Sequence, residues 1–159
     1  DSQRDTSFRI YNNTLVSPNG TGTFILLSGN AQRQVVEVKN NLCVHASSFI
    51  ALYNRGNLVL VSDHNLGYKL RSASAYKLSK TRSASGMTIS EWRARGYDPH
   101  SLYTDPRLDH DFCPTAGSPA RNAGVDLSAY FSTDRLGAAR PTGRAWTIGS
   151  CEAAELSSP

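Results

Sequence analysis

The sequence predicts an all-β protein in which short strands stack in successive coils, the architecture of a solenoid. Three observations lead to this prediction: a composition rich in turn-forming residues, a loose internal repeat, and strand patterns in which alternate residues are apolar. Of the 159 residues, 39% are hydrophobic and only 19% are charged, while Ser, Asn, Gly, Thr and Ala are plentiful. This composition suits a turn-rich β protein better than a helical bundle.

The internal repeat consists of three segments, residues 8–16, 36–44 and 58–66. Each begins with a short run in which alternate residues are apolar, as in Val36 and Val38. A period of two places such residues on one buried face of a strand. Repeats about 20 to 30 residues apart are typical of solenoids. Two further β-rich runs, 23–27 and 48–53, predict two or three strands per coil.

Each repeated segment turns at an asparagine. Asn tolerates the left-handed backbone of a sharp corner, and its amide can hydrogen-bond to neighbouring backbone. If the coils stack, Asn13, Asn41 and Asn65 form an amide ladder; the alternative is that they are ordinary surface turns. Their recurrence after an alternating strand favours the ladder.

Stacking also predicts which outward side chains meet on neighbouring coils. Arg9 is expected over Glu37, and Tyr11 over Lys39. The next coil presents Val59 and Val61 outward. Exposed apolar pairs of this kind indicate a covered face, so we expect either the folded-back C-terminal segment or a partner chain there.

The chain is expected to form one domain with three parts. Residues 1–70 hold the coils, and residues 71–87, rich in Ser, Ala, Lys and Arg, form an exposed connection. Residues 88–159 hold a short helix and an irregular cap. The helix is expected to start at Thr88 or Ser90 as N-cap, with Gly96 closing it.

Charge and hydropathy exclude two classes of partner. The net charge is +4, but the arginines are scattered, with no basic run that would follow a nucleic-acid backbone. An acidic polysaccharide is compatible with this balance. No apolar stretch reaches the roughly 20 residues of a membrane span. The chain begins at Asp1 without Met or a signal pattern, so we expect a processed or excised product.

The second half resembles the terminal segment of bacterial right-handed parallel β-helix proteins. That group carries Trp, Gly-x-Asp-x-His-Ser and Asp-Pro motifs, then a Gly-Ser-Pro-Ala segment and a closing Arg-Pro and Ile-Gly motif. The matching runs are residues 89–92, 96–101, 104–108, 111–113, 117–126, 134–141 and 148–152. The resemblance implies a right-handed parallel β-helix whose irregular C-terminal cap covers its open end, in a bacterial protein that is secreted or on the cell surface.

The cysteines are interpreted against that resemblance. Cys113 and Cys151 occupy positions where this chain departs from the family pattern, which implies a disulfide between them and an oxidising compartment. Cys43, in an apolar run, is expected to be a buried free thiol. The three cysteines show no CxxC pair and no zinc-type spacing, so we expect no metal site and no cofactor.

The resembling family includes polysaccharide lyases of the alginate and chondroitin type, other glycan-processing enzymes and many extracellular proteins of unassigned activity. A lyase needs a base and a cation together on one outward sheet face. The coil residues that could supply these groups are Arg9, Lys39, His45 and His64. The alternative, ordinary solvent-facing side chains, is favoured. A shallow glycan-binding strip would use Arg9, Tyr11, Lys39, Tyr53 and His64.

Two motifs in the second half could carry chemistry. Residues 98–101, with His100 beside a carboxylate and a hydroxyl, could form a hydrolytic site, but a loop-fixing hydrogen-bond role is favoured because such close neighbours rarely build a triad. The acidic run 109–111 with Asp105 could bind calcium, yet it lacks a recognisable loop spacing and is expected to form turns.

Two functions follow from this sequence. The first is the C-terminal part of an extracellular protein that binds or degrades polysaccharide, with its active groove on upstream coils. The second is a structural or adhesive module without catalysis. In either case upstream coils or a partner chain are expected at the N-terminal open end. Convergence of Arg9, Lys39 and His64 on one groove would favour the first.

Overall fold

A computed structural model of the chain describes residues 6–28, 33–53, 57–79 and 85–153. Nearly all of its regular structure is β-strand, which confirms the all-β prediction. The helical elements of the described residues are α1 (Ile89–Ala94) and a single 3-10 turn, Ser72–Ser74. Within those residues, no helix is long and apolar enough to cross a membrane.

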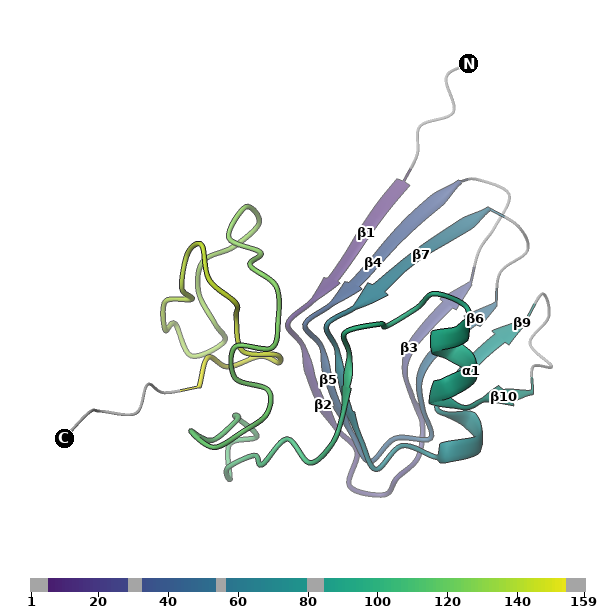
Figure 1. Ribbon diagram of the computed structural model, residues 1–159, viewed down its shortest axis with the longest axis horizontal. Helices are drawn as coiled ribbons and strands as arrows, with labels where there is room; N and C mark the ends of the chain where they lie inside the picture. The colour runs from purple at the N-terminus through teal and green to yellow at the C-terminus, as the bar shows by residue number, and fades with distance from the viewer. Residues whose placement is uncertain (1–5, 29–32, 54–56, 80–84, 154–159) are drawn as a thin grey trace, which may run out of the picture.

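The strands follow one another in three rounds of the chain. They are β1 (Thr6–Tyr11), β2 (Thr14–Val16) and β3 (Thr23–Ser28), then β4 (Gln34–Lys39), β5 (Leu42–Val44) and β6 (Ser48–Tyr53), then β7 (Leu58–Asp63), β8 (Leu66–Tyr68) and β9 (Tyr76–Ser79). Each strand of the first two rounds pairs in parallel with the strand three places later, which gives the sheets β1-β4-β7, β2-β5-β8 and β3-β6-β9. Figure 1 shows these strands side by side, round upon round.

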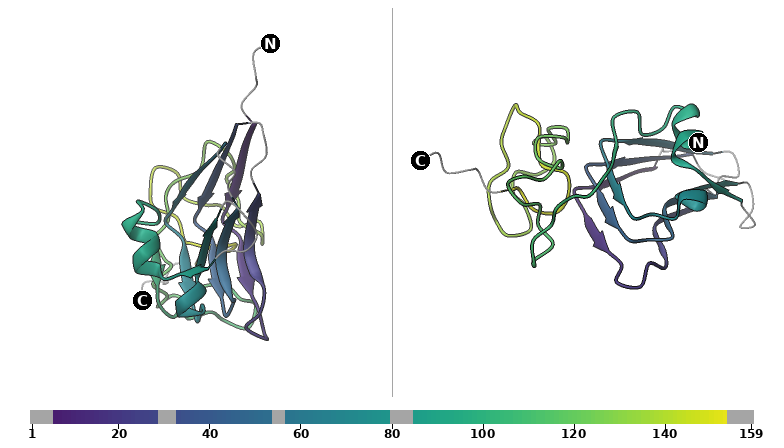
Figure 2. Two further views of the ribbon diagram at one scale, coloured as in Figure 1. Left: turned by 90° about the vertical axis from the view of Figure 1, so that its right-hand side faces the viewer. Right: turned by 60° about the horizontal axis from the view of Figure 1, so that its bottom comes forward.

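Two short strands extend the sheets. β10 (Gly86–Met87) pairs antiparallel with β9, and β11 (Leu102–Tyr103) pairs parallel with β8. The third round is therefore followed on two of the three sheets by further backbone pairing. The first round has no strand beyond it among the described residues, so we call it the upstream end and the side of α1 the downstream end (Figure 2).

The alternating pattern of the repeats sets the core. Val36 and Val38 of β4 and Leu58 and Leu60 of β7 are buried, whereas Val59 is exposed. The register places Arg9 beside Glu37 and Tyr11 beside Lys39, as predicted. Side-chain alternation along β4 and β7 thus separates one buried and one outward face.

The predicted asparagine ladder is confirmed. The Asn41 amide oxygen accepts from the backbone N–H of Asn13 at 3.0 Å, and the Asn65 oxygen accepts from the backbone N–H of Asn41 at 2.9 Å. Asn41 and Asn65 are fully buried, which excludes the surface-turn alternative for both. Burial is tolerated because each amide makes several hydrogen bonds.

The ladder ends on Asp98 at the downstream end. The Asp98 carboxylate is fully buried and accepts from the side chains of Asn65, Ser62, Ser101 and Trp92. The favoured loop-fixing role of residues 98–101 is therefore what Asp98 and Ser101 perform. A carboxylate suits this place because it only accepts, and the last rung of the ladder needs acceptors.

α1 closes the core at the same end. Thr88 is its N-cap in a capping box with Glu91, one of the two predicted starts. Trp92 is fully buried and stacks on Tyr76 with ring centroids 4.4 Å apart. Tyr76 in turn contacts Phe49 at 6.1 Å, and Phe49 stacks on Phe24 at 5.4 Å. An aromatic column therefore runs through all three rounds to the helix.

Residues 71–87, expected to be an exposed connection, contain the strands β9 and β10 in their described part, while residues 80–84 lie outside the described residues. β9 pairs with β6, and Tyr76 at its start is fully buried. The sequence signal is weak because only Tyr76 and Leu78 alternate within a Ser- and Lys-rich background. A four-residue strand of this kind forms because a neighbouring strand is already present for it to pair with.

The C-terminal segment, residues 104–153, lies along one side of the strands instead of over their open end (Figure 1). Its Ala120 and Ile148 pack on Leu42 and Leu66, which face outward from β5 and β8. Of the expected helix and cap, α1 thus lies at the downstream end, whereas residues 104–153 lie beside the strands and leave Val59 and Val61 of β7 exposed. The outward leucines of β5 and β8 offered the apolar surface that the segment covers.

Hydrogen bonds attach this segment to every round. Asn12 donates to the carbonyls of Thr147 and Gly149, Asn40 donates to that of Val125, and His64 contacts that of Ala123. Asn12, Asn40 and His64 occupy the same left-handed turn position, with φ of 49°, 56° and 53°. At Gly124 a Cβ would lie 2.7 Å from the Asn40 side chain, so this approach requires glycine.

The cysteine predictions are confirmed. Cys113 and Cys151 form a disulfide within the C-terminal segment, with their Cα atoms 5.4 Å apart. Cys43 is a free thiol that is fully buried, and burial raises the pKa of that thiol to about 12. A disulfide is typical of proteins from oxidising compartments.

Candidate functional site

The residues predicted to bind glycan separate into two groups in the structure. Arg9, Tyr11 and Lys39 lie side by side on the outward face of β1 and β4. His64 follows β7 at the edge of the same sheet, whereas Tyr53 ends β6 on a different sheet. His45 follows β5, and its imidazole packs on Gly20. The outward face of β1-β4-β7 is therefore the surface where the candidate chemistry gathers.

Glu37 is the centre of this face. Its carboxylate accepts from Lys39 Nζ at 2.6 Å and from the Tyr11 hydroxyl at 2.9 Å, and Arg9 Nε lies 3.8 Å away. The hydrogen bond from Lys39 is the main cause that holds the pKa of Glu37 below its usual value. Arg9 and Lys39 thus converge on a carboxylate of the protein, and His64 does not reach it.

Tyr130 from the C-terminal segment completes the group. Its ring lies 5.5 Å from that of Tyr11, and the Arg9 guanidinium stands 4.7 Å over its centroid. Sequence reasoning missed Tyr130, since nothing in residues 127–131 indicates that this segment folds back onto the first strand, where Tyr130 meets Tyr11 from 119 residues away. We call Arg9, Tyr11, Glu37, Lys39 and Tyr130 the polar strip.

The polar strip is poorly equipped to abstract a proton. Burial, followed by the hydrogen bond to Glu37, raises the pKa of Tyr11 far above its ordinary value. A tyrosine in that state keeps its proton and cannot act as a base near neutral pH. The hollow that Arg9 borders is lined mainly by apolar side chains of the upstream end, such as Phe8 and Leu26.

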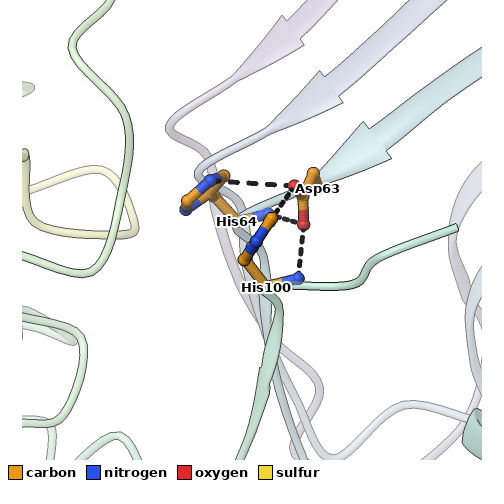
Figure 3. A group of neighbouring side chains, drawn as sticks. All are labelled: Asp63, His64 and His100. Carbon is orange, nitrogen blue, oxygen red and sulfur yellow. Dashed lines mark hydrogen bonds and ion pairs between the residues drawn. The ribbon is translucent and has the colours of Figure 1, made fainter. Parts of the chain in front are cut away.

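A second group, the histidine cluster, continues the strip at β7. It consists of Asp63, His64 and His100 (Figure 3). Asp63 lies beside Lys39 in the strand register. His100 Nδ1 is 2.7 Å from Asp63 Oδ2, and His64 Nε2 is 3.7 Å from the same oxygen. The two imidazoles stack with centroids 5.1 Å apart.

The Asp63 carboxylate is held from behind by the backbone. Its Oδ1 accepts from the backbone N–H of His64 at 2.9 Å and of His100 at 2.8 Å. Burial, the largest single influence, raises the pKa of Asp63, but the hydrogen bonds from His100 and His64 outweigh it and the net shift is downward. Asp63 is therefore a fixed anion whose second oxygen points at both rings.

Sequence reasoning found two members of this cluster and not the third. His64 was predicted for glycan binding and His100 for a loop, whereas Asp63 was not considered. The repeat alignment of residues 36–44 with 58–66 places Val61 opposite Lys39, whereas the strand register is two residues further on and places Asp63 there. The acidic residues suspected of binding calcium make turns instead: Asp109 Oδ1 accepts from the backbone of Asp111 and Cys113.

No family model, no curated protein and no solved structure matches this chain. The assignment to a β-helix family therefore stays a prediction from the motifs of the second half.

Proposed function

We propose that this chain is the terminal part of a right-handed parallel β-helix and that it binds polysaccharide on the polar strip without cleaving it. Three strands per round, each paired in parallel with its counterpart in the next round, support the β-helix assignment. The observation that carries the binding proposal is the pairing of Arg9, Glu37 and Lys39 beside two tyrosine rings. Fixed donors, acceptors and aromatic faces are what a sugar surface requires.

Charge compensation favours a neutral glycan over a uronate polymer. Arg9 and Lys39 carry two positive charges, and Glu37 together with the neighbouring Asp63 carries two negative ones. A lyase must offer uncompensated cations to the enolate that forms during elimination. The strip has its cations already paired, so its chemistry supports recognition better than cleavage.

The proposed setting is the cell surface or the extracellular space of a bacterium. The disulfide between Cys113 and Cys151 fits an oxidising compartment. The motif resemblance of residues 88–152 supplies the bacterial assignment.

Affinity electrophoresis through gels containing neutral and acidic polysaccharides tests the proposal. Retardation by a neutral glycan, weakened at least about tenfold in Tyr130→Ala, is expected if the ring contributes a stacking surface. Tyr53→Ala is the matched control, because Tyr53 lies on another sheet. Absence of retardation by every glycan, or equal loss in both variants, would refute binding at the strip. Release of unsaturated products would refute the absence of cleavage.

A second function, assembly of coils, is supported by the upstream end. Phe8 and Leu26 are 48% and 59% exposed there, and the Asn13 amide oxygen has no partner among the described residues. A further coil of the same type, with an asparagine in register, would pair with the first round. Sedimentation of the chain tests this proposal. We expect association that depends on concentration and that Leu26→Arg abolishes. A monomer at all concentrations, measured without other chains, would indicate that the coil that pairs with the first round belongs to the same chain.

A further inference from the structure

We propose that Asp63, His64 and His100 form a binding site for a divalent transition-metal ion, with zinc as the best-fitting member of that class. This goes beyond glycan binding, because it concerns a different set of side chains. The sequence predicted no metal site since the cysteines lack zinc-type spacing. Here Asp63 and His64 are neighbours in the chain, and His100, 37 residues after Asp63, meets them only in the fold.

The three donor atoms lie close together. One atom from each residue lies within 4.8 Å of the others. Zinc bonds of about 2.0–2.1 Å in a tetrahedron place neighbouring ligand atoms roughly 3.3 Å apart. The distances from Asp63 Oδ2 to His100 Nδ1 and His64 Nε2, 2.7 and 3.7 Å, bracket this value. Because the two imidazoles are stacked with their planes 19° apart, binding also requires the exposed His100 ring to turn until both lone pairs meet at one ion.

The surroundings orient two of the ligands. His64 Nδ1 lies 3.1 Å from the carbonyl oxygen of Ala123, which can only accept, so Nδ1 carries the proton and Nε2 presents its lone pair to the cluster. Asp63 Oδ1 is held by two backbone N–H groups, which leaves Oδ2 for an ion. Histidines that bind metal commonly donate their other N–H to a carbonyl or carboxylate in this way.

The donor set selects the class of ion. Two imidazoles and one carboxylate suit zinc and its neighbours in the first transition row, whereas calcium and magnesium prefer oxygen ligands throughout. An ion would take the place of the proton between His100 Nδ1 and Asp63 Oδ2. The His100 side chain is 67% exposed, so water can supply the remaining coordination position.

Titration of the untagged, chelator-treated chain tests the site. Calorimetry with Zn²⁺ is expected to show one saturable site, and Co²⁺ should give the visible absorption of a four- or five-coordinate ion. His100→Ala should weaken Zn²⁺ binding by at least about tenfold, since lesser changes around metal ligands already cost that much. The variant keeps its backbone N–H to Asp63, so the fold is expected to persist.

A matched control lies in the same chain. His110 Nε2 is 3.2 Å from the Asp111 carboxylate, a histidine–carboxylate pair with both side chains well exposed. His110→Ala should leave affinity unchanged. Zinc should also raise the unfolding temperature of the parent chain but not that of His100→Ala, because an ion that binds the folded state stabilises it.

Three results would overturn the site. They are no saturable binding by the parent chain, equal affinity in His100→Ala, and equal loss in His110→Ala. In each case the cluster would serve only to attach the loop of His100 to β7. None of these results depends on glycan retention, so failure here and failure of the polysaccharide proposal are distinguishable.

Discussion

The two ends of the strand stack are finished in opposite ways. At the downstream end, Asp98 receives the last rung of the asparagine ladder and Trp92 covers the aromatic column, and both side chains are fully buried. At the upstream end, Phe8 and Leu26 are exposed and Asn13 lies at the surface. The same repeat therefore contributes very differently to the free energy of unfolding at its first and last rounds.

The difference shows what closing a repeat requires. Stacked rounds leave a row of polar groups and a row of apolar groups at each end, because each round is satisfied only by its neighbours. The downstream end meets both needs with one loop and one short helix. Substitutions along the stack should measure how strongly each end depends on this closure.

The largest effect is expected for Asp98→Ala. Asn65, Ser62, Ser101 and Trp92 would lose an acceptor in a buried place. Because each buried polar group left without a hydrogen-bond partner costs about 1–3 kcal/mol, we expect a loss of about 3–5 kcal/mol in the free energy of unfolding. Urea denaturation measures it. Asp105→Ala, at an exposed turn, is the control, and a loss below about 1 kcal/mol for Asp98→Ala would show that the ladder needs no terminal acceptor.

The ladder itself should weaken toward the upstream end. Asn41→Ala removes hydrogen bonds to Ile10 and Lys39 and an acceptor for Asn13 in a buried site, so we expect a loss of about 2–3 kcal/mol. Asn13→Ala at the exposed end should cost less than about 1 kcal/mol. Thermal unfolding of both variants gives the comparison. Equal losses would mean that the two ends are energetically alike.

A smaller, pH-dependent effect is expected at the polar strip near the upstream end. The pKa of Glu37 is lower in the folded chain than its usual 4.5, mainly through Lys39. The contribution of Glu37 to the free energy of unfolding is therefore fully present above pH 4.5. It is lost as the pH falls through the lower pKa of the folded chain. In that pH range, amide hydrogen exchange should become faster in β1 relative to β8. Glu37→Gln should remove this dependence at a cost of up to about 1 kcal/mol.

The smallest effect is expected for Leu26→Ser. Leu26 is 59% exposed, so its replacement should change the free energy of unfolding by less than about 0.5 kcal/mol. Leu52→Ala, on the adjacent strand but 1% exposed, should cost about 2–5 kcal/mol. Chemical denaturation of both variants is the measurement. A large loss for Leu26→Ser would indicate that the upstream end is packed in solution.

The sequence could predict the features that recur in each repeated segment. Asn41 and Asn65 recur after the same alternating strand, so their stacking followed from the pattern alone. Tyr130 and the position of the C-terminal segment did not, because they depend on contacts between residues that are distant in the chain and carry no periodicity. Asp63 was missed because the repeat alignment placed Val61 beside Lys39, two residues out of the true register, and because nothing in the pattern indicated the return of His100 from the far side of α1.

The C-terminal segment also has a mechanical consequence. A stack whose rounds contact only their neighbours would peel under tension one round at a time, since each strand can leave without disturbing those beyond it. The segment binds Asn12, Asn40 and His64, one residue from each round, and the bridge from Cys113 to Cys151 closes a loop within it. A pulling force on the first strand would then be shared by all three rounds, and rupture would occur as a single event.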